Sequence, residues 1–414
     1  MASPFPSPLT SDVLIVGAGP AGLSLAIALA QAGLAATVVE QQPLAALAEP
    51  APDGREIALT HPSRATLQRL GTWAGLAPHE VGFIREAQVH DGPLARHGAL
   101  RLGTQGTGLE ALGFIVPNHA LRRTAHAVAA RTPGVRIVTD AQVARVAVTP
   151  TQAELEYGDT GGARHTLRAP LLVAADSRFS ATRRQLGIGA AMTDFGRTVI
   201  VCRLRHEHPH GEVAHECFGY ERTLAVLPLP DDPGDGAHQC SAVVTTTADD
   251  AQALMALPPE AFAARVQAQF QGRLGAMQPA GERHAYPLVA VYAQRFAGMR
   301  CALLGDAAVG MHPVTAHGFN LGLAGADRLA RTLAEARARG EDIGAASVLA
   351  RYARAHHRHA WPIYQGTNAI VRLYTDARPL PRLLRQAVLA GAGRLPPLRA
   401  AIVAQLTGRA ALGA

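Results

Sequence analysis

The hydrophobic pattern of the first 40 residues is that of a buried strand, a helix and a second buried strand. Residues 13–16 form a short apolar run, and apolar side chains then recur at helical spacing over 23–30. Gly33 stands where such a helix would end, and the apolar run 36–40 closes with an acid, Glu40. A strand, helix and strand in this order predict the start of a parallel sheet.

Further along, the pattern alternates between short strands and helices, and in the middle of the chain the strands become longer. We expect helices over 122–131, 259–270 and about 320–339, and a hairpin turn at 158–162. We expect strands over 135–138, 141–148, 155–157, 171–174, 198–205, 223–227, 241–247, 284–289 and 301–304. From 345 onward the chain is expected to be helical and rich in Arg, with interruptions at Pro379, Pro381, Pro396 and Pro397.

These elements predict a mixed α/β (α+β) fold, and 414 residues are enough for more than one core. A Rossmann-like domain would be discontinuous and consist of 1–85, 100–185 and 290–345. A mostly antiparallel sheet domain, expected to bind substrate, would be inserted into it and consist of 86–99 and 186–289. A helical segment, 346–414, would follow.

The charge of the chain is basic and unevenly distributed. All 39 basic residues are Arg, against 32 acids, and the absence of Lys excludes lysine Schiff-base chemistry. Ten Arg and a single acid lie between residue 351 and the end. The charge therefore gathers at the C-terminus and not along a nucleic-acid groove, so no nucleic-acid partner is expected, and a compositional bias towards Arg remains an alternative explanation.

Cysteine usage and the N-terminus bear on metals and location. The four cysteines have no close pairing, which favours buried apolar roles over a zinc site or disulfides; they are Cys202, Cys217, Cys240 and Cys301. The first residues contain neither the basic nor the apolar region of a signal peptide. We therefore expect no metal and a cytoplasmic protein.

The first motif with chemical content is the segment Gly17-Ala18-Gly19-Pro20-Ala21-Gly22. Gly17 would permit a tight turn, Gly19 would let the backbone approach a pyrophosphate, and Gly22 would let the helix pack closely on the sheet. The helix N-terminus offers free N–H groups to phosphates, and Glu40 can accept hydrogen bonds from a ribose. The segment predicts a dinucleotide site.

Two later segments suggest a flavin. Asp306 follows the strand expected at 301–304 and could hold a polyol such as ribitol, although an Asp in this position can equally cap a helix. The loop 311–322 runs into a helix whose N-terminus could stabilise negative charge on a reduced flavin. His312 and His317 in this loop could act as acid or base, or could only pack and bond locally.

Taken together, the chain resembles the class A flavoprotein aromatic monooxygenases over nearly its whole length. Within them it is most similar to the ubiquinone-biosynthesis hydroxylases of the UbiM type. The resemblance rests on GAGPAG at 17–22, DGREIAL at 53–59, VPNH at 116–119, AADSRFSATRR at 174–184, RHAYPL at 283–288 and GDAAVGMHPVTAHGFNLGL at 305–323. Two departures from the broader family, Ser177 after Asp176 and His317 before Gly318, match the UbiM type.

The resemblance implies a set of cofactor contacts. Arg55 and Asn118 would lie against FAD and Asp306 would hold its ribitol. Asp176 and Arg178 would serve the shared pyrophosphate and NAD(P)H region. The flavin ring would be bordered by Pro313, Gly318, Phe319 and Asn320.

The resemblance also implies the reaction. An FAD-dependent monooxygenase would use NAD(P)H and O2, through a flavin C4a-hydroperoxide, to hydroxylate a prenylated phenol or quinol such as demethoxyubiquinol. The substrate hydroxyl would need a hydrogen-bond or proton acceptor, and the candidates in or near the pocket are Tyr220, Tyr286, His312 and His317, with Pro313 beside the ring.

The sequence leaves three questions open. The C-terminal segment carries an Arg-rich amphipathic pattern that could lie on the inner face of a membrane or could simply cover the flavin domain; it comprises Leu380, Arg382, Leu383, Leu384, Arg385 and Leu389. The substrate could instead be a small soluble aromatic compound. The chain could also be a flavin-bearing structural subunit of a quinone-synthesis complex.

Overall fold

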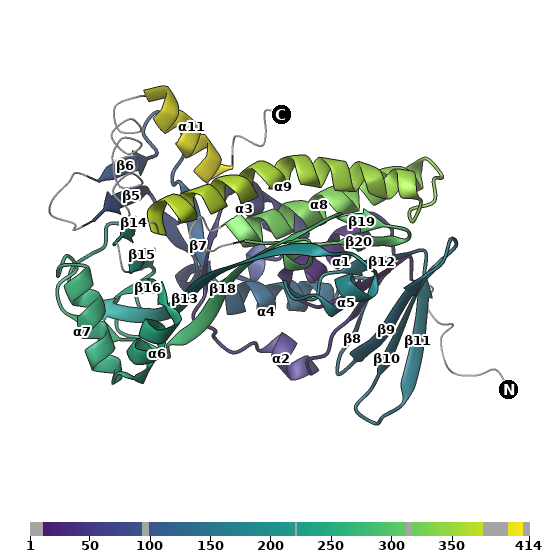
Figure 1. The fold of residues 1–414 in the computed structure, drawn as a ribbon, viewed down its shortest axis with the longest axis horizontal. Coiled ribbons are helices and arrows are strands. Elements are labelled where there is room, and N and C mark those ends of the chain that lie inside the picture. Colours follow the sequence, from purple (N-terminus) through teal and green to yellow (C-terminus); the bar gives the residue numbers. More distant parts are fainter. Residues whose placement is uncertain (1–10, 93–98, 220–221, 312–316, 376–395, 409–414) are drawn as a thin grey trace.

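The computed structural model describes residues 11–92, 99–219, 222–311, 317–375 and 396–408 (Figure 1). The elements up to residue 185 are β1 (Val13–Val16), α1 (Pro20–Gln31), β2 (Ala36–Val39), α2 (Leu44–Ala48), β3 (Glu56–Leu59), α3 (His61–Leu70), β4 (Gly82–Ile84), β5 (Glu86–Asp91), β6 (Leu100–Gly103), β7 (Gly113–Pro117), α4 (Asn118–Ala129), β8 (Val135–Val138), β9 (Gln142–Val148), β10 (Ala153–Gly158), β11 (Arg164–Ala169), β12 (Leu171–Ala174) and α5 (Ala181–Gln185). The later elements are β13 (Ala190–His206), β14 (Val213–Phe218), β15 (Thr223–Leu229), β16 (His238–Thr247), α6 (Ala248–Ala256), α7 (Pro259–Gln269), β17 (Met277–Pro279), β18 (His284–Ala293), β19 (Ala297–Gly298), β20 (Cys301–Leu303), β21 (Val309–Gly310), α8 (His317–Ala338), α9 (Ala346–Thr375) and α11 (Pro396–Thr407).

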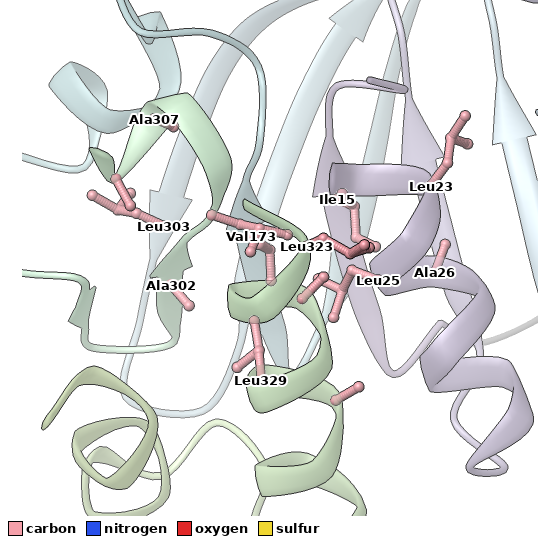
Figure 2. Packing of buried hydrophobic residues seen from close by; sticks show 14 of the residues in the cluster. Ile15, Leu23, Leu25, Ala26, Val173, Ala302, Leu303, Ala307, Leu323 and Leu329 are labelled. Atoms are coloured by element: carbon pink, nitrogen blue, oxygen red, sulfur yellow. The ribbon is translucent and has the colours of Figure 1, made fainter. Parts of the chain in front are cut away.

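A six-stranded sheet with the order β19-β20-β12-β1-β2-β8 forms the centre of the first layer, and all its pairs except β19–β20 are parallel. Because side chains alternate along a strand, β1 contributes to two cores. Val13 and Ile15 pack with the helices α1, α4 and α8, whereas Leu14 and Val16 pack with the three-stranded sheet β9-β10-β11 on the other face. Figure 2 shows Ile15 of β1 and Val173 of β12 among the leucines of α1 and α8.

A nine-stranded, mostly antiparallel sheet forms the second layer, with the order β21-β18-β13-β16-β15-β14-β5-β6 and β17 beside β13. One face is covered by α6 and α7; Phe262 of α7, and Phe270 directly after α7, pack against Cys202, Leu224 and Val244 of the strands. On the other face, Val199 and Val201 form a cluster with Leu288, Phe195, Val243 and Tyr286. This second face is the one that meets the loop 53–56, as described below.

The predicted fold class is confirmed, and the differences between the predicted and the observed elements are local. The helix expected from 122 begins at Asn118, directly after Pro117 at the end of β7. The strand expected over 198–205 extends back to Ala190, through an irregularity between Asp194 and Thr198, because its first residues pair with β18. The three-stranded sheet β3-β7-β4 was not expected, since each of its strands is short.

The structure also bears on cysteines, metals and membrane spans. All four cysteines are buried and unpaired, as expected. Among the described residues, no group of His, Cys, Asp and Glu side chains is arranged to hold a metal ion. None of the described helices combines the length and apolar character that crossing a bilayer requires.

Candidate functional site

The glycine turn after β1 contains two glycines that the protein requires and one that faces open space. Gly17 has φ +106°, and a Cβ atom on it would lie 2.5 Å from the carbonyl oxygen of Ala175. A Cβ atom on Gly22 would collide with the carbonyl oxygen of Gly17. A Cβ atom on Gly19 would meet nothing within 4 Å. Internal packing therefore explains Gly17 and Gly22, whereas Gly19 leaves room for a ligand at the start of α1.

The polar groups around this turn suit a nucleotide. Gly19 is the N-cap residue of α1, no side chain caps the helix, and its first N–H groups are left for an anion. The carboxylate of Glu40 accepts hydrogen bonds from the backbone N–H groups of Ala18 (2.7 Å) and Gln42 (3.0 Å). Glu40 is thereby fixed beside the turn, where the sequence predicted an acceptor for a ribose.

The side chain of Arg55 is held by a carboxylate, Asp53, that was not assigned a role from the sequence. The Nε atom of Arg55 donates to Asp53 Oδ2 at 2.9 Å, and Asn118 Nδ2 donates to the same oxygen at 2.7 Å. Burial raises the pKa of Asp53, but the hydrogen bond and charge of Arg55 outweigh it, so the pKa lies below its usual value. These bonds fix the guanidinium group of Arg55 on one side, and the side chain, which is 49% exposed, can still meet an anion.

Tyr286 completes this group from the large sheet. Its hydroxyl donates to the main-chain oxygen of Asp53 at 2.7 Å, and its ring lies 5.6 Å from the guanidinium carbon of Arg55. Burial raises the pKa of Tyr286, so the phenol stays protonated as a donor. The structure thus brings Arg55, Asn118 and Tyr286 together, and it directs the Tyr286 hydroxyl to the backbone of the Arg55 loop.

Asp306 and Asp176 have different surroundings. Arg178 donates to Asp306 Oδ2 from Nη2 (3.0 Å) and also to the carbonyl oxygen of Val289 (3.0 Å). Asp306 remains 38% exposed, so its carboxylate is accessible. Asp176 accepts from Ser180 Oγ (2.6 Å) and from the N–H of Thr182 (3.3 Å), and so stabilises the start of α5. If Asp176 also contacts the cofactor, as predicted, its carboxylate must make that contact while it keeps these two hydrogen bonds.

The N-terminus of α8 carries the remaining predicted residues that the structure describes. His317 is the first residue of α8, and a Cβ atom on Gly318 would meet nothing within 4 Å. The side chain of Asn320 accepts from the Thr60 N–H (3.0 Å) and donates to the Ala58 carbonyl oxygen (2.8 Å), so it ties α8 to the end of β3. Phe319 is partly buried against the main core. His312, Pro313 and Tyr220 lie outside the described residues.

An ion pair between a buried carboxylate, Glu56, and the partly exposed Arg203 links the Arg55 loop to the large sheet. Glu56 Oε1 accepts from Arg203 Nε at 2.8 Å, and the Glu56 side chain is 2% exposed. Burial raises the pKa of Glu56 to about 7, against the opposing charge of Arg203. The pair lines a cavity of about 340 Å³ together with His79, Glu80, Ile115, Pro117, His119, Leu229, Pro230, Asp231, Asp232, Pro233, Gln239 and Ala280. Neither Asp53 nor Glu56 was assigned a role from sequence, although both flank Arg55.

The role of Arg55 as an anion contact gives a first prediction. We expect Arg55→Ala to weaken FAD binding about 10- to 150-fold, because a hydrogen bond to a charged group contributes about 1.5–3 kcal/mol. Titration of the apoprotein with FAD, followed by flavin fluorescence, measures the effect.

A matched control is Arg69→Ala. Arg69 forms an ion pair with Asp327 at the same 2.5 Å separation as the Arg55–Asp53 pair, and it is similarly exposed, at 52%. Equal affinities of the two variants for FAD would contradict a specific role for Arg55.

Comparison with known proteins places these features in context. A sequence-family model described as "FAD binding domain" matches residues 10–367. The ubiquinone hydroxylase UbiM of Neisseria meningitidis is 46% identical over 404 residues, which cover 97% of this chain and 85% of that protein. The ubiquinone hydroxylase UbiL of Rhodospirillum rubrum is 33% identical over 407 residues, covering 97% and 91%. Among solved structures, p-nitrophenol 4-monooxygenase PnpA from Pseudomonas putida has a similar fold, with a TM-score of 0.77, 19% identity and coverage of 96% and 98% of the two chains.

Proposed function

This chain belongs to the FAD-binding-domain family that contains the ubiquinone hydroxylases, and we propose that it is an FAD-dependent monooxygenase of ubiquinone biosynthesis. The observation that carries the proposal is 46% identity to UbiM over nearly the whole chain. The open space at Gly19 and the accessible side chains of Arg55 and Asp306 suit the FAD that such an enzyme binds. NAD(P)H would be the reductant and O2 the oxidant.

The bound flavin supplies the redox chemistry, since its reduced form activates O2 and delivers one oxygen atom to an electron-rich ring. We propose that the chain's own residues bind and orient it. The N–H groups at the start of α1 would hold the pyrophosphate, Glu40 the ribose, and Asp306 the ribitol. Arg55 would meet the phosphates from the other side, with Asp53, Asn118 and Tyr286 as its positioning residues.

The contacts of the flavin ring and of NAD(P)H are proposals too. Gly318, Phe319 and Asn320, with Pro313, would border the ring at the N-terminus of α8, where the helix dipole stabilises negative charge. Arg178 would serve the pyrophosphate and NAD(P)H region, with Asp176 behind it. His312, His317 and Tyr220 remain candidates for contact with the substrate.

We also propose the division of the chain into a discontinuous flavin domain, an inserted substrate domain and a C-terminal helical segment. The two sheet systems support this division. β6 at 100–103 pairs with β5 in the nine-stranded sheet, which favours a boundary after 103 in place of 99. β18 crosses the boundary expected at 290, since its strand runs to Ala293.

The proposed substrate is a quinol with a prenyl tail, and demethoxyubiquinol is the specific candidate. Such a tail partitions into a bilayer, so we propose that the enzyme meets its substrate at the cytoplasmic face of the membrane. The amphipathic pattern offered for that contact, over 380–389, lies outside the described residues. Sedimentation with anionic vesicles tests the contact, and recovery of all the protein in the supernatant would contradict it.

The decisive experiment for the function is complementation. We expect the gene to restore ubiquinone in at least one of a set of bacterial strains that each lack a single ring hydroxylase, with mass spectrometry identifying the intermediate consumed. Failure to rescue any strain would overturn the assignment to ubiquinone synthesis. Stimulation of NAD(P)H oxidation by a soluble phenol, and not by a prenylated one, would favour a soluble substrate instead.

A purely structural role can be tested with a variant of weakened flavin binding, such as Gly19→Val, provided that the variant is shown to be purified without FAD. A hydroxylase without flavin cannot restore quinone production. Unchanged production by such a flavin-free variant would identify the chain as a structural subunit.

A further inference from the structure

Glu216 is a carboxylic acid in the middle of β14, on the face of the large sheet that points away from α6 and α7. Its neighbour Cys217 packs into the cluster formed with Phe262 of α7 and Phe270 directly after it. Since side chains alternate along a strand, Glu216 points to the opposite face. Figure 1 shows β14 next to β15, with α6 and α7 together on one side of these strands.

This face of the sheet is the one that meets the candidate flavin site. Glu216 is opposite Ala225 of β15, Ala225 is opposite Val243 of β16, and Val243 is opposite Val201 of β13, so all four side chains share one face. Val201 lies against the Arg55 loop, because a Cβ atom on Gly54 would come within 3.0 Å of its Cγ2 atom. Three strand spacings of about 4.8 Å put Glu216 roughly 14 Å from Val201.

The side chains around Glu216 on this face are apolar. They are Ala214 and Phe218 on its own strand, Ala225 on β15 and Val89 on β5. Ala214 and Val89 border a cluster that includes Ile84, Leu100, Ile115 and, from α11, Val403. The titratable groups on this face include Asp91, which pairs with Phe218 across β5 and β14, Arg203 on β13 and Tyr286 on β18.

No hydrogen bond or ion pair joins Glu216 to any residue that the structure describes. Arg203, the cation that crosses this face, is engaged with Glu56. The surrounding protein raises the pKa of Glu216 to about 8 through desolvation, yet the residue keeps partial exposure to solvent. A carboxyl group that is desolvated by its neighbours, has no partner among the described residues and keeps partial exposure can meet a polar ligand.

We propose that Glu216 is a catalytic residue that accepts the proton of the substrate's ring hydroxyl during oxygen transfer. This inference rests on the hydroxylase function proposed above. Glu216 shares a sheet face with Val201, which contacts the Arg55 loop, and a quinol held on this face would present its hydroxyl to the Glu216 carboxylate. The apolar side chains of Val89, Ala225 and Phe218 would surround the rest of the ring.

The proton transfer balances as follows. The O–H bond of the ring hydroxyl breaks, an O–H bond forms on Glu216, and the electron pair stays on the ring oxygen, which makes the ring carbons more nucleophilic. O2 takes up the hydride of NAD(P)H, which brings two electrons and one proton, and one further proton from solvent; one oxygen atom then bonds to a ring carbon as a hydroxyl group and the other leaves as hydroxide. When that carbon loses its hydrogen as a proton, this proton converts the hydroxide to water, and Glu216 returns its own proton to the ring oxygen.

A carboxyl group with an ordinary pKa would be a poor base for this step, because a phenol is a much weaker acid. Raising the pKa of Glu216 reduces the difference between its pKa and that of the phenol, which makes the proton transfer less unfavourable. The same burial that costs the folded protein some stability therefore suits the group to this reaction.

Glu216→Gln tests the proposal in the full-length, FAD-loaded protein, with a demethoxyubiquinol analogue that carries a short isoprenoid tail. We expect product formation to fall about 100-fold, the effect typical of a lost general base. FAD content and flavin reduction by NAD(P)H should be unchanged, so NAD(P)H oxidation becomes uncoupled from product. The wild-type rate should rise with pH towards about 8, and the variant should lose this rise, which separates Glu216 from Asp91.

Two further variants make the result unambiguous. Glu216→Asp keeps a carboxylate and should recover part of the rate and of the pH dependence. Glu156→Gln changes a partly exposed strand carboxylate that accepts a hydrogen bond from Arg145, and should leave the rate unchanged. Since the pKa of Glu216 is raised on folding, the wild type loses stability from about pH 4.5 to about pH 8, so Glu216→Gln should melt at a higher temperature than the wild type at pH 8.5.

Product formation by Glu216→Gln within twofold of the wild type, with the same pH profile, would overturn the role of Glu216 while leaving the hydroxylase function intact. Absence of product from the wild type itself would instead overturn the proposed function, and the role of Glu216 with it.

Discussion

Gly19→Val is expected to give a folded protein that no longer retains FAD. The backbone of Gly19 is extended, with φ −69° and ψ 171°, a conformation that Val adopts readily. A Cβ atom there would meet no protein atom within 4 Å, so the side chain would instead fill the space over the start of α1. Loss of two backbone hydrogen bonds to a pyrophosphate costs about 3 kcal/mol, or about 100-fold in affinity.

The measurement is made on apoprotein in two parts. Thermal unfolding of the apo variant should stay close to that of the apo wild type, since replacing a glycine N-cap with an apolar residue costs about 1 kcal/mol. Titration with FAD should then show the lost affinity. Recovery of Gly19→Val with a full complement of FAD would mean that the open space at Gly19 is not the pyrophosphate site.

Two other glycines provide the comparison. Gly366 of α9 is also free of neighbours within 4 Å, and Gly366→Ala should bind FAD normally, with stability unchanged or slightly raised because Ala favours helix. Gly17→Ala should differ from both, because φ +106° is strained for Ala and the new methyl group would overlap Ala175. It should lose stability even without FAD.

The sequence predicted those parts of the fold that depend on strong local signals. The first strand, helix and strand were predicted within three residues, because a glycine turn and two apolar strands leave little choice. The longer strands of the inserted sheet were also found, with the N-terminal extension of β13 missed because its first residues are partly exposed and lack a clear apolar pattern. The sheet β3-β7-β4 escaped notice because its strands are three to five residues long.

The candidate site was predicted in its conspicuous residues but not in those that support them. Arg55 and Asn118 were expected near FAD, but the carboxylate of Asp53 that binds both could not be inferred, since Asn118 is 65 residues away in sequence. Glu216 was missed for a related reason. Its strand, β14, was not predicted, and the apolar residues beside it, Val89 of β5 and Ala225 of β15, come from other strands.

Removing Arg203 is expected to destabilise the protein in a pH-dependent way. Arg203→Met leaves the carboxylate of Glu56 buried without its cation, and breaking one side of a buried ion pair costs about 3 kcal/mol. Glu56 Oε2 already lacks a hydrogen-bond partner among the described residues, so it offers no compensation. The urea midpoint at pH 8 should therefore fall well below that of the wild type.

The pH dependence follows from the pKa of Glu56, which folding raises from 4.5 to about 7. A carboxyl group with a raised pKa contributes most stability when protonated, so the wild type should lose stability as the pH rises from about 4.5 to about 7. Without Arg203 the pKa of Glu56 should rise further, since the opposing charge is gone. The loss caused by Arg203→Met should accordingly be small near pH 5 and largest at pH 8.

Two variants separate this ion pair from a general effect of losing an Arg on β13. Arg205→Met, two residues along the same strand, removes pairs with Asp232 and Asp235 at an exposed position and should cost no more than about 1 kcal/mol at either pH. The double variant Glu56→Gln/Arg203→Met should regain most of the stability at pH 8, because no buried charge remains. If Arg203→Met lost equal stability at pH 5 and pH 8, the loss would come from packing and not from the buried carboxylate, and Glu56 would have no part in the pH response of the fold.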